Sequence, residues 1–329
     1  MESQPNPSVS RRAFLQQVSI AGMGTLLVDR TVLAGAAKTA LPTAVLGKTK
    51  QRLTRLGLGT WPCGKSRDVG VDGVARLVQE ALELGIDFID TAHNYGAAEE
   101  GIAQGLGKRR EQVFLTTKVW ADTAAEARKS LESSLRTLRT DHMDLVYLHS
   151  VGNRDVERVL APGGAVDYLL KEKAKGTTRF IGISGHSMVM HFVPLIKTGK
   201  IDVVMMAMNF VDRHTYGFED KVLPVARQHG MGVVCMKAFG GMRGGFATAS
   251  GRPIGAMVRR ALLQQAVRYA LDLPGVATAV IGPHTVEQLR ENVQFVRNYK
   301  PLSKEEMQSL AKLGKQLAPK WGPHFGPVA

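Results

Sequence analysis

The chain has 329 residues, of which 44% are hydrophobic and 22% charged, a composition typical of a globular protein with a substantial core and not of a disordered one. Its 43 Lys and Arg residues against 29 Asp and Glu residues give a formal net charge of +14. The basic residues are spread along the sequence and accompany no nucleic-acid-binding motif, so we expect no nucleic acid partner. The charge instead favours anionic small molecules such as a phosphate-bearing cofactor.

Cysteine usage excludes two further classes of protein. Only Cys63 and Cys235 occur, so the sequence predicts neither a disulfide framework nor a CxxC metal pair. We expect both thiols to be reduced, in or near the core, and no metal site.

Residues 1–37 have the layout of an export signal. Arg11 and Arg12 precede a short apolar stretch, residues 18–28, and small residues follow at 34–36. This resembles a twin-arginine (Tat) signal and predicts recognition by the Tat export machinery and a periplasmic location. The alternative, a chance Arg-Arg pair before a buried helix, leaves the small residues unexplained. The stretch is too short to span a bilayer permanently, and we expect no permanent membrane span elsewhere.

From residue 38 to 329, short β-branched or apolar runs alternate with segments whose apolar residues recur at helical spacing. Eight strand–helix units of about 30 residues predict parallel strands joined by crossover helices, closed into one single-domain (β/α)8 TIM barrel. A hairpin-like segment, residues 45–54, precedes the first unit and could plug the bottom of the barrel. The eight predicted strands are Leu56–Gly59, Phe88–Asp90, Val113–Lys118, Leu145–Leu148, Phe180–Ser184, Val203–Asn209, Gly232–Lys237 and Ala277–Ile281.

Four ionisable residues lie at or just after the ends of three predicted strands: Asp90, Tyr95, Lys118 and His149. In a barrel of this type, catalytic groups lie at the C-terminal ends of the strands, so we expect the four to meet at one rim. Any one of them alone could be a salt-bridge member or a structural histidine. Their joint placement favours a catalytic site.

If such a site transfers a hydride to a carbonyl carbon, negative charge is left on the oxygen, which then needs a proton donor. A tyrosine, with a reference pKa of about 10, is a poor acid unless a neighbouring cation stabilises its phenolate. The pattern therefore predicts Tyr95 as the proton donor and Lys118 as the cation. Asp90 would hold and balance the ammonium, and His149 would orient the carbonyl oxygen.

These motifs resemble those of the aldo-keto reductases. The resemblance implies reduction of small aldehydes or ketones to alcohols, or the reverse, with NADP(H) as cofactor, and assigns the same four catalytic roles. The family's likeness to potassium-channel β-subunits leaves an alternative open, a cofactor-binding redox sensor or regulatory subunit with little turnover. The resemblance spans nearly the whole chain after the signal, in order, through Gly85–Gly96, Asp144–His149, Gly182–Ser184, Ile281–Gly282 and Glu287–Asn292.

The resemblance also implies residues that hold the nicotinamide. No GxGxxG follows a predicted strand, so a Rossmann mode is unsupported, and the family instead uses a Ser-Asn pair and a Gln. This chain has Ser184 but Gly185 in place of Asn, and His186 is predicted to supply the missing hydrogen bond. Met205 stands where Gln is expected, and Asn209, four residues later, completes the predicted nicotinamide-side set.

The rest of the cofactor is expected to lie across the rim. Residues 240–245 form a glycine-rich loop that could fold over the pyrophosphate, with Arg243 as a charge partner. Gln288, Glu291 and Asn292 match the family's adenosine contacts. The usual contacts of the 2′-phosphate are replaced here, so NAD(H) is an alternative to NADP(H).

Overall fold

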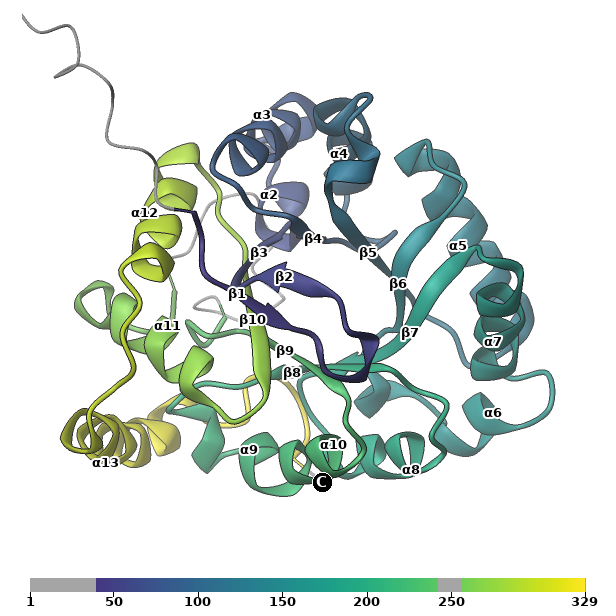
Figure 1. Cartoon of the computed structure of the whole chain (residues 1–329). Helices are drawn as coiled ribbons and strands as arrows, with labels where there is room; N and C mark the ends of the chain where they lie inside the picture. Colours follow the sequence, from purple (N-terminus) through teal and green to yellow (C-terminus); the bar gives the residue numbers. More distant parts are fainter. Residues whose placement is uncertain (1–39, 242–255, 329) are drawn as a thin grey trace, which may run out of the picture. The chain divides into compact units, whose positions relative to one another are not determined.

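The computed structural model describes residues 40–241 and 256–328. Within these ranges, eight parallel strands form a closed barrel in sequence order, with β10 pairing with both β9 and β3. This confirms the predicted single (β/α)8 barrel, seen end-on in Figure 1. The strands are β3 Leu56–Gly59, β4 Phe88–Asp90, β5 Phe114–Val119, β6 Met143–Leu148, β7 Thr178–Gly185, β8 Val203–Ala207, β9 Gly232–Met236 and β10 Val276–Ile281.

Helices surround the barrel because each carries one apolar face that packs on the strands. The apolar residues that recur at helical spacing in the sequence face the core; in α3, for example, Val74, Leu77 and Val78 are buried. None of the helices in the described ranges is long and apolar enough to cross a membrane. The helices are α2 Trp61–Lys65, α3 Gly70–Glu83, α4 Ala98–Leu106, α5 Ala124–Leu138, α6 Val156–Leu160, α7 Ala165–Lys175, α8 Phe192–Lys197, α9 Phe218–Lys221, α10 Leu223–Gln228, α11 Leu263–Asp272, α12 Val286–Arg297 and α13 Lys304–Trp321.

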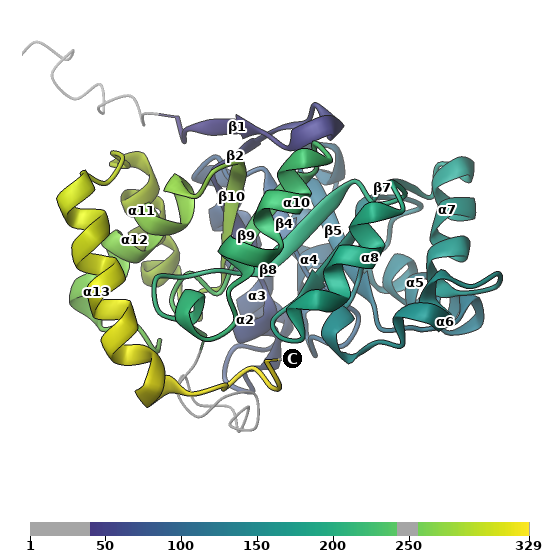
Figure 2. The ribbon, with the colours of Figure 1, turned by 90° about the horizontal axis from the view of Figure 1, so that it is seen from below.

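A two-stranded antiparallel hairpin, β1 Thr43–Val45 and β2 Arg52–Thr54, covers the end of the barrel where the strands begin (Figures 1 and 2). Leu46, at its turn, is 0% exposed and packs with the side chains inside the barrel. The backbone N–H of Lys48 donates to the carbonyl of Gly230 at 2.7 Å. The hairpin therefore closes the bottom of the barrel, and a ligand has to approach from the other end.

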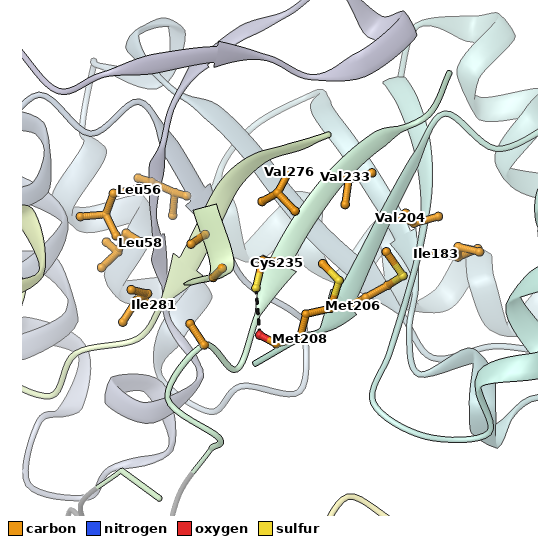
Figure 3. Packing of buried hydrophobic residues seen from close by; sticks show 14 of the residues in the cluster. Leu56, Leu58, Ile183, Val204, Met206, Met208, Val233, Cys235, Val276 and Ile281 are labelled. Atoms are coloured by element: carbon orange, nitrogen blue, oxygen red, sulfur yellow. Dashed lines mark hydrogen bonds between the residues drawn. The ribbon is translucent and has the colours of Figure 1, made fainter. Parts of the chain in front are cut away.

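The interior of the barrel is filled by side chains that alternate with those facing the helices. Both cysteines are buried and free, and the Cys235 thiol lies 3.2 Å from the carbonyl oxygen of Met208 (Figure 3). Burial raises the pKa of the Cys63 thiol to about 12, so this thiol stays protonated. The two cysteines therefore behave as apolar core residues.

The sixth barrel strand is shorter than predicted, ending at Ala207 instead of Asn209. The side-chain oxygen of Asn209 accepts hydrogen bonds from the backbone N–H groups of Val211 and Asp212, at 3.0 and 2.8 Å. Such side-chain bonds turn the backbone out of the strand. The turn fixes the start of the βα loop on that side of the rim.

Candidate active site

The four residues predicted to be catalytic lie together at the C-terminal rim of the barrel. Asp90 ends β4, Lys118 lies in β5 one residue from its end, and His149 directly follows β6. Asp90, Tyr95 and His149 line a cavity of about 850 Å³, a size common among ligand pockets, and buried Lys118 contacts Asp90. Parallel strands produce this convergence because their carboxyl ends share one rim.

The Asp90–Lys118 ion pair is the most strongly buried charged contact in this group, with the two residues 5% and 1% exposed. The lysine Nζ donates to both carboxylate oxygens, at 2.7 and 2.6 Å, and to the carbonyl of Thr91 at 2.8 Å. Burial by itself lowers the pKa of Lys118, but the charge of Asp90, then Tyr95 and the hydrogen bonds, raise it above its usual value. Lys118 therefore stays protonated.

Tyr95 lies over this pair, with the ammonium of Lys118 4.9 Å from its ring centroid. Burial raises the pKa of Tyr95, the charge of Lys118 lowers it, and that of Asp90 raises it again. The net direction is upward, so Tyr95 holds its proton at neutral pH. Because a phenolate here would face the ammonium, the proton can still be given up to an acceptor in the cavity.

His149 stands edge-on to two aromatic rings, with centroids 5.9 Å from Tyr95 and 5.4 Å from Trp120. Burial, followed by the positive charge of Lys118, lowers the pKa of His149 well below its usual value. The imidazole is therefore neutral and carries a single N–H. A neutral donor beside Tyr95 can hydrogen-bond a carbonyl oxygen without adding a second charge.

Four of the predicted cofactor residues line the same cavity: His186, Gln288, Glu291 and Asn292. Burial, then the positive charge of Lys237, lowers the pKa of His186 well below its usual value, so the ring is neutral. The side-chain oxygen of Gln288 accepts the backbone N–H of His284 at 2.8 Å, which fixes it at the start of α12. Glu291 is paired with Arg260 at 2.7 Å.

Two other predicted cofactor residues lie outside the cavity lining. Ser184 is buried, and its hydroxyl lies 3.4 Å from both the carbonyl of Leu148 and the N–H of Ser150. Asn209 is 0% exposed and holds its loop, donating to Asp212 at 2.6 Å and to the carbonyl of Lys237 at 3.1 Å. The amide of Asn209 is thus hydrogen-bonded within its own loop, and the predicted contact of Asn209 with the cofactor stays a prediction. Arg243 lies outside the described residues.

The structure also shows cavity residues that the sequence analysis did not single out. Lys237, which follows β9, and Trp61, which begins α2, both line the cavity. Lys237 stands at a buried strand end, as Lys118 does, and that signal could have identified it. The described residues contain no group of three or more His, Cys, Asp or Glu side chains arranged to hold a metal ion.

The C-terminal tail returns to the rim after α13, at the end of the barrel opposite the hairpin (Figure 2). Phe325 lines the cavity and its N–H donates to the hydroxyl of Tyr216 at 2.7 Å. The ring of His324 lies 3.1 Å, through Nε2, from the carbonyl of Gly240. The tail therefore forms one wall of the site.

A closed (β/α)8 barrel with a tyrosine over a buried Lys–Asp pair at its open rim is the arrangement expected of a carbonyl-reducing oxidoreductase. The aldo/keto reductase family model matches residues 55–261. The chain belongs to the aldo/keto reductase family and is therefore an oxidoreductase.

Individual relatives agree with this membership. The chain is 30% identical over 311 residues to an uncharacterized oxidoreductase, YrpG, of Bacillus subtilis, covering 76% of this chain and 90% of that protein. It is 28% identical over 276 residues to the methylglyoxal reductase DkgA of Yersinia pestis, covering 81% and 92%. Its fold resembles that of an aldo-keto reductase from Klebsiella pneumoniae solved in complex with NADPH, with a TM-score of 0.66, 23% identity, and 84% and 96% of the two chains covered.

The first prediction concerns the stability of the buried ion pair. Replacing Asp90 with Asn leaves the Lys118 ammonium buried without its carboxylate, and we expect the free energy of unfolding to fall by about 3–5 kcal/mol. Urea denaturation followed by circular dichroism measures this loss. The control is Asp167→Asn, which removes the carboxylate from the exposed Asp167–Lys171 pair and should change stability far less. Equal losses in the two variants would show that burial does not set the cost.

Proposed function

We propose that this protein reduces small aldehydes or ketones to alcohols, or catalyses the reverse reaction, with NADP(H) as cofactor and Tyr95 as proton donor. The supporting observation is the position of Tyr95: its ring lies 4.9 Å from the Lys118 ammonium, which Asp90 holds at 2.6 Å, at the wall of the rim cavity. A protonated phenol and a buried cation are together what delivery of a proton to a nascent alkoxide requires.

In the proposed reaction, the hydroxyl proton of Tyr95 moves to the oxygen of the substrate carbonyl. The substrate carbonyl oxygen accepts hydrogen bonds from Tyr95 and from the neutral imidazole of His149, which both line the cavity. A dinucleotide held in the cavity would supply the hydride. As negative charge grows on the oxygen, the Tyr95 proton transfers to it, and the phenolate that forms is stabilised by Lys118. Asp90 keeps the ammonium in place during this change.

The residues present fit an extended dinucleotide. The cavity runs from Tyr95 to the start of α12, where Gln288 and Asn292 supply amide groups. Met236, at the end of β9, gives an apolar and polarizable surface on which a flat ring can pack. Gly282 lines the cavity beside Pro62, and a Cβ there would lie 2.4 Å from the proline ring, so this close approach requires glycine. The NADPH complex of the Klebsiella pneumoniae structure supports NADP(H) as the cofactor.

The substrate is expected to be small and carbonyl-bearing. Trp120, 40% exposed, stands beside His149 at the wall of the cavity, with the Arg154 guanidinium 4.2 Å above its ring. This gives the substrate a rigid apolar contact next to the proton donor. Since the Yersinia pestis relative is named as a methylglyoxal reductase, methylglyoxal is a suitable first substrate to assay.

The second prediction tests the role of Tyr95. In Tyr95→Phe the ring remains but the proton is lost, so we expect the reduction rate to fall on the order of 100-fold or more while NADP+ binding is retained. Stopped-flow absorbance at the reduced nicotinamide band, with methylglyoxal and a panel of aldehydes, measures the rate. Tyr168→Phe, in α7 away from the cavity lining, is the matched control. Near-wild-type turnover by Tyr95→Phe would remove this residue from the mechanism.

The same panel of aldehydes tests whether this protein is an enzyme or a cofactor-binding sensor or regulatory subunit. An enzyme turns over many equivalents of NADPH with at least one carbonyl compound. A sensor binds NADP(H) with similar affinity yet completes at most a single slow turnover across the panel. That second result would contradict the proposed activity while leaving the cofactor assignment intact.

We also propose that residues 1–37 direct export by the Tat machinery to the periplasm, on the support of the paired Arg11 and Arg12, the apolar stretch and the small residues that follow. The third prediction is that a reporter fused to residues 1–40 is recovered outside the cytoplasm. A fusion carrying Arg11→Lys and Arg12→Lys should stay inside. If the unaltered fusion also stays in the cytoplasm, the export proposal fails without affecting the proposed catalysis.

A further inference from the structure

Tyr95 lies in a segment, residues 91–97, that joins β4 to α4 and contains neither helix nor strand. The segment is tied to α2, where the N–H of Ala97 donates to the carbonyl of Gly64 at 3.0 Å. That contact does not fix the distance to β5, the strand that carries Lys118. Since the Tyr95 ring lies 4.9 Å from the Lys118 ammonium, the segment needs contacts with β5 to hold this spacing.

Glu99 supplies the first of these contacts. It follows Tyr95 by four residues, lies in the first turn of α4 and is 4% exposed. Its carboxylate accepts a hydrogen bond from the hydroxyl of Thr117 in β5 at 2.8 Å, and that hydroxyl lies 3.2 Å from the hydroxyl of Ser134 in α5. Burial raises the pKa of Glu99, and the hydrogen bonds from Ser134 and Thr117 lower it again in part. The carboxylate is therefore held between a barrel strand and a surrounding helix.

His93, two residues before Tyr95, makes a second contact with the same strand. Its Nδ1 lies 3.2 Å from the carbonyl oxygen of Lys118 and 2.9 Å from the hydroxyl of Ser130. Ser130 and Ser134 are four residues apart, so both hydroxyls lie on one face of α5, and both are buried. The segment around Tyr95 is thus bound on both sides to β5 and α5.

The hydroxyls beside Glu99 do not need a carboxylate. Thr117 and Ser134 lie close enough to bond each other, and an apolar side chain at position 99 would avoid the cost of desolvating a charge. What the carboxylate adds is a directional link between the start of α4 and the strand that carries Lys118. Tyr95 directly precedes the start of that link, so its place over the ammonium depends on it.

We propose that Glu99 is a positioning residue for the proton transfer: through its bond to Thr117 it holds Tyr95 over Lys118, with His93 supporting the segment from the other side. Glu99 is not among the residues that line the cavity, so it acts through Tyr95 and not on the substrate. The inference rests on the proposed function, since it takes Tyr95 as the proton donor.

The effect of position differs in sign from the effect of the Glu99 charge. Lys118 lowers the pKa of Tyr95, so a Tyr95 that moves away from the ammonium has a higher pKa. Loss of the Glu99 charge acts in the opposite direction, because a carboxylate disfavours the phenolate. The other groups that face Tyr95, the charged Asp90 and the neutral His149, are the same in every variant below. An upward shift of the kinetic pKa therefore reports a change of position.

The fourth prediction concerns the hydride-transfer rate of Glu99→Met, measured by stopped flow from about pH 6 to about pH 10. The fold should persist, because Thr117 and Ser134 can still bond each other. We expect the plateau rate to fall on the order of 10-fold and the kinetic pKa to rise, so that the rate stays constant to a higher pH than in the wild type. The Kd of NADP+ and the KM of methylglyoxal should change less than about twofold, because Glu99 touches neither ligand.

Three further variants make the test specific. Glu99→Gln retains an acceptor oxygen for Thr117 and should keep most of the rate, with no upward shift. Thr117→Val keeps the side-chain shape and should give the same upward shift at a smaller size, because Ser134 can still donate to Glu99; it remains informative if Glu99→Met folds poorly. Glu172→Met is the matched control, since this glutamate is 7% exposed in α7 and contacts Lys175 at 2.7 Å. It should leave the rate and the pH profile unchanged.

Hydrogen exchange followed by mass spectrometry tests the link without turnover. The backbone amides of residues 95–98 should exchange faster in Glu99→Met than in the wild type, because local opening of the segment costs less free energy once the link is gone. The amides of α7 should exchange at the wild-type rate.

Three results would overturn the inference. The first is a wild-type rate and pH profile in both Glu99→Met and Thr117→Val. The second is an equal loss of rate in Glu99→Met and Glu99→Gln, and the third a downward shift of the kinetic pKa, since both would assign the effect to the charge. Each leaves the proposed function standing. Near-wild-type turnover by Tyr95→Phe would instead overturn the proposed function together with this inference.

Discussion

The site depends on one interaction, the buried ion pair between Asp90 and Lys118. A lysine that is 1% exposed stays charged here because a carboxylate accepts two of its hydrogen bonds, at 2.7 and 2.6 Å. Without that partner, burial would favour the neutral amine. Burial is the main reason why Tyr95 keeps its proton at rest, and the charge of Asp90 offsets part of the opposing effect of Lys118 on the pKa of the phenol.

The barrel makes this pair possible by placing two neighbouring strand ends in register. Asp90 in β4 pairs with Thr116 in β5, and the Thr116 hydroxyl donates to the Asp90 carboxylate at 2.9 Å. At the opposite end the hairpin seals the barrel with Leu46, so one rim alone is open to a ligand. A rigid, closed scaffold keeps the reacting groups oriented without a large reorganisation when charge develops.

The sequence was sufficient for the eight strands and for the convergence of Asp90, Lys118 and His149, because parallel strands bring their ends to one rim. Tyr95 joins them from the loop that follows β4. The sequence did not show that the sixth barrel strand ends at Ala207, because hydrogen bonds between the Asn209 side chain and its own loop leave no pattern in the sequence. The sequence also did not predict that Phe325 lines the cavity. This residue lies more than 80 positions after the glycine-rich loop at the rim, and no local sequence pattern shows where the C-terminal tail runs. Lys237 carried the same strand-end signal as Lys118 but no motif drew attention to it.

The central claim is that the positive charge of Lys118, fixed by Asp90, sets the proton affinity of Tyr95. The pH dependence of the hydride-transfer rate in Lys118→Met, compared with wild type, tests it most directly. Because the charge of Lys118 lowers the pKa of Tyr95, its removal is predicted to raise the apparent kinetic pKa and to slow the reaction. An unchanged pH profile at an unchanged rate would contradict the account.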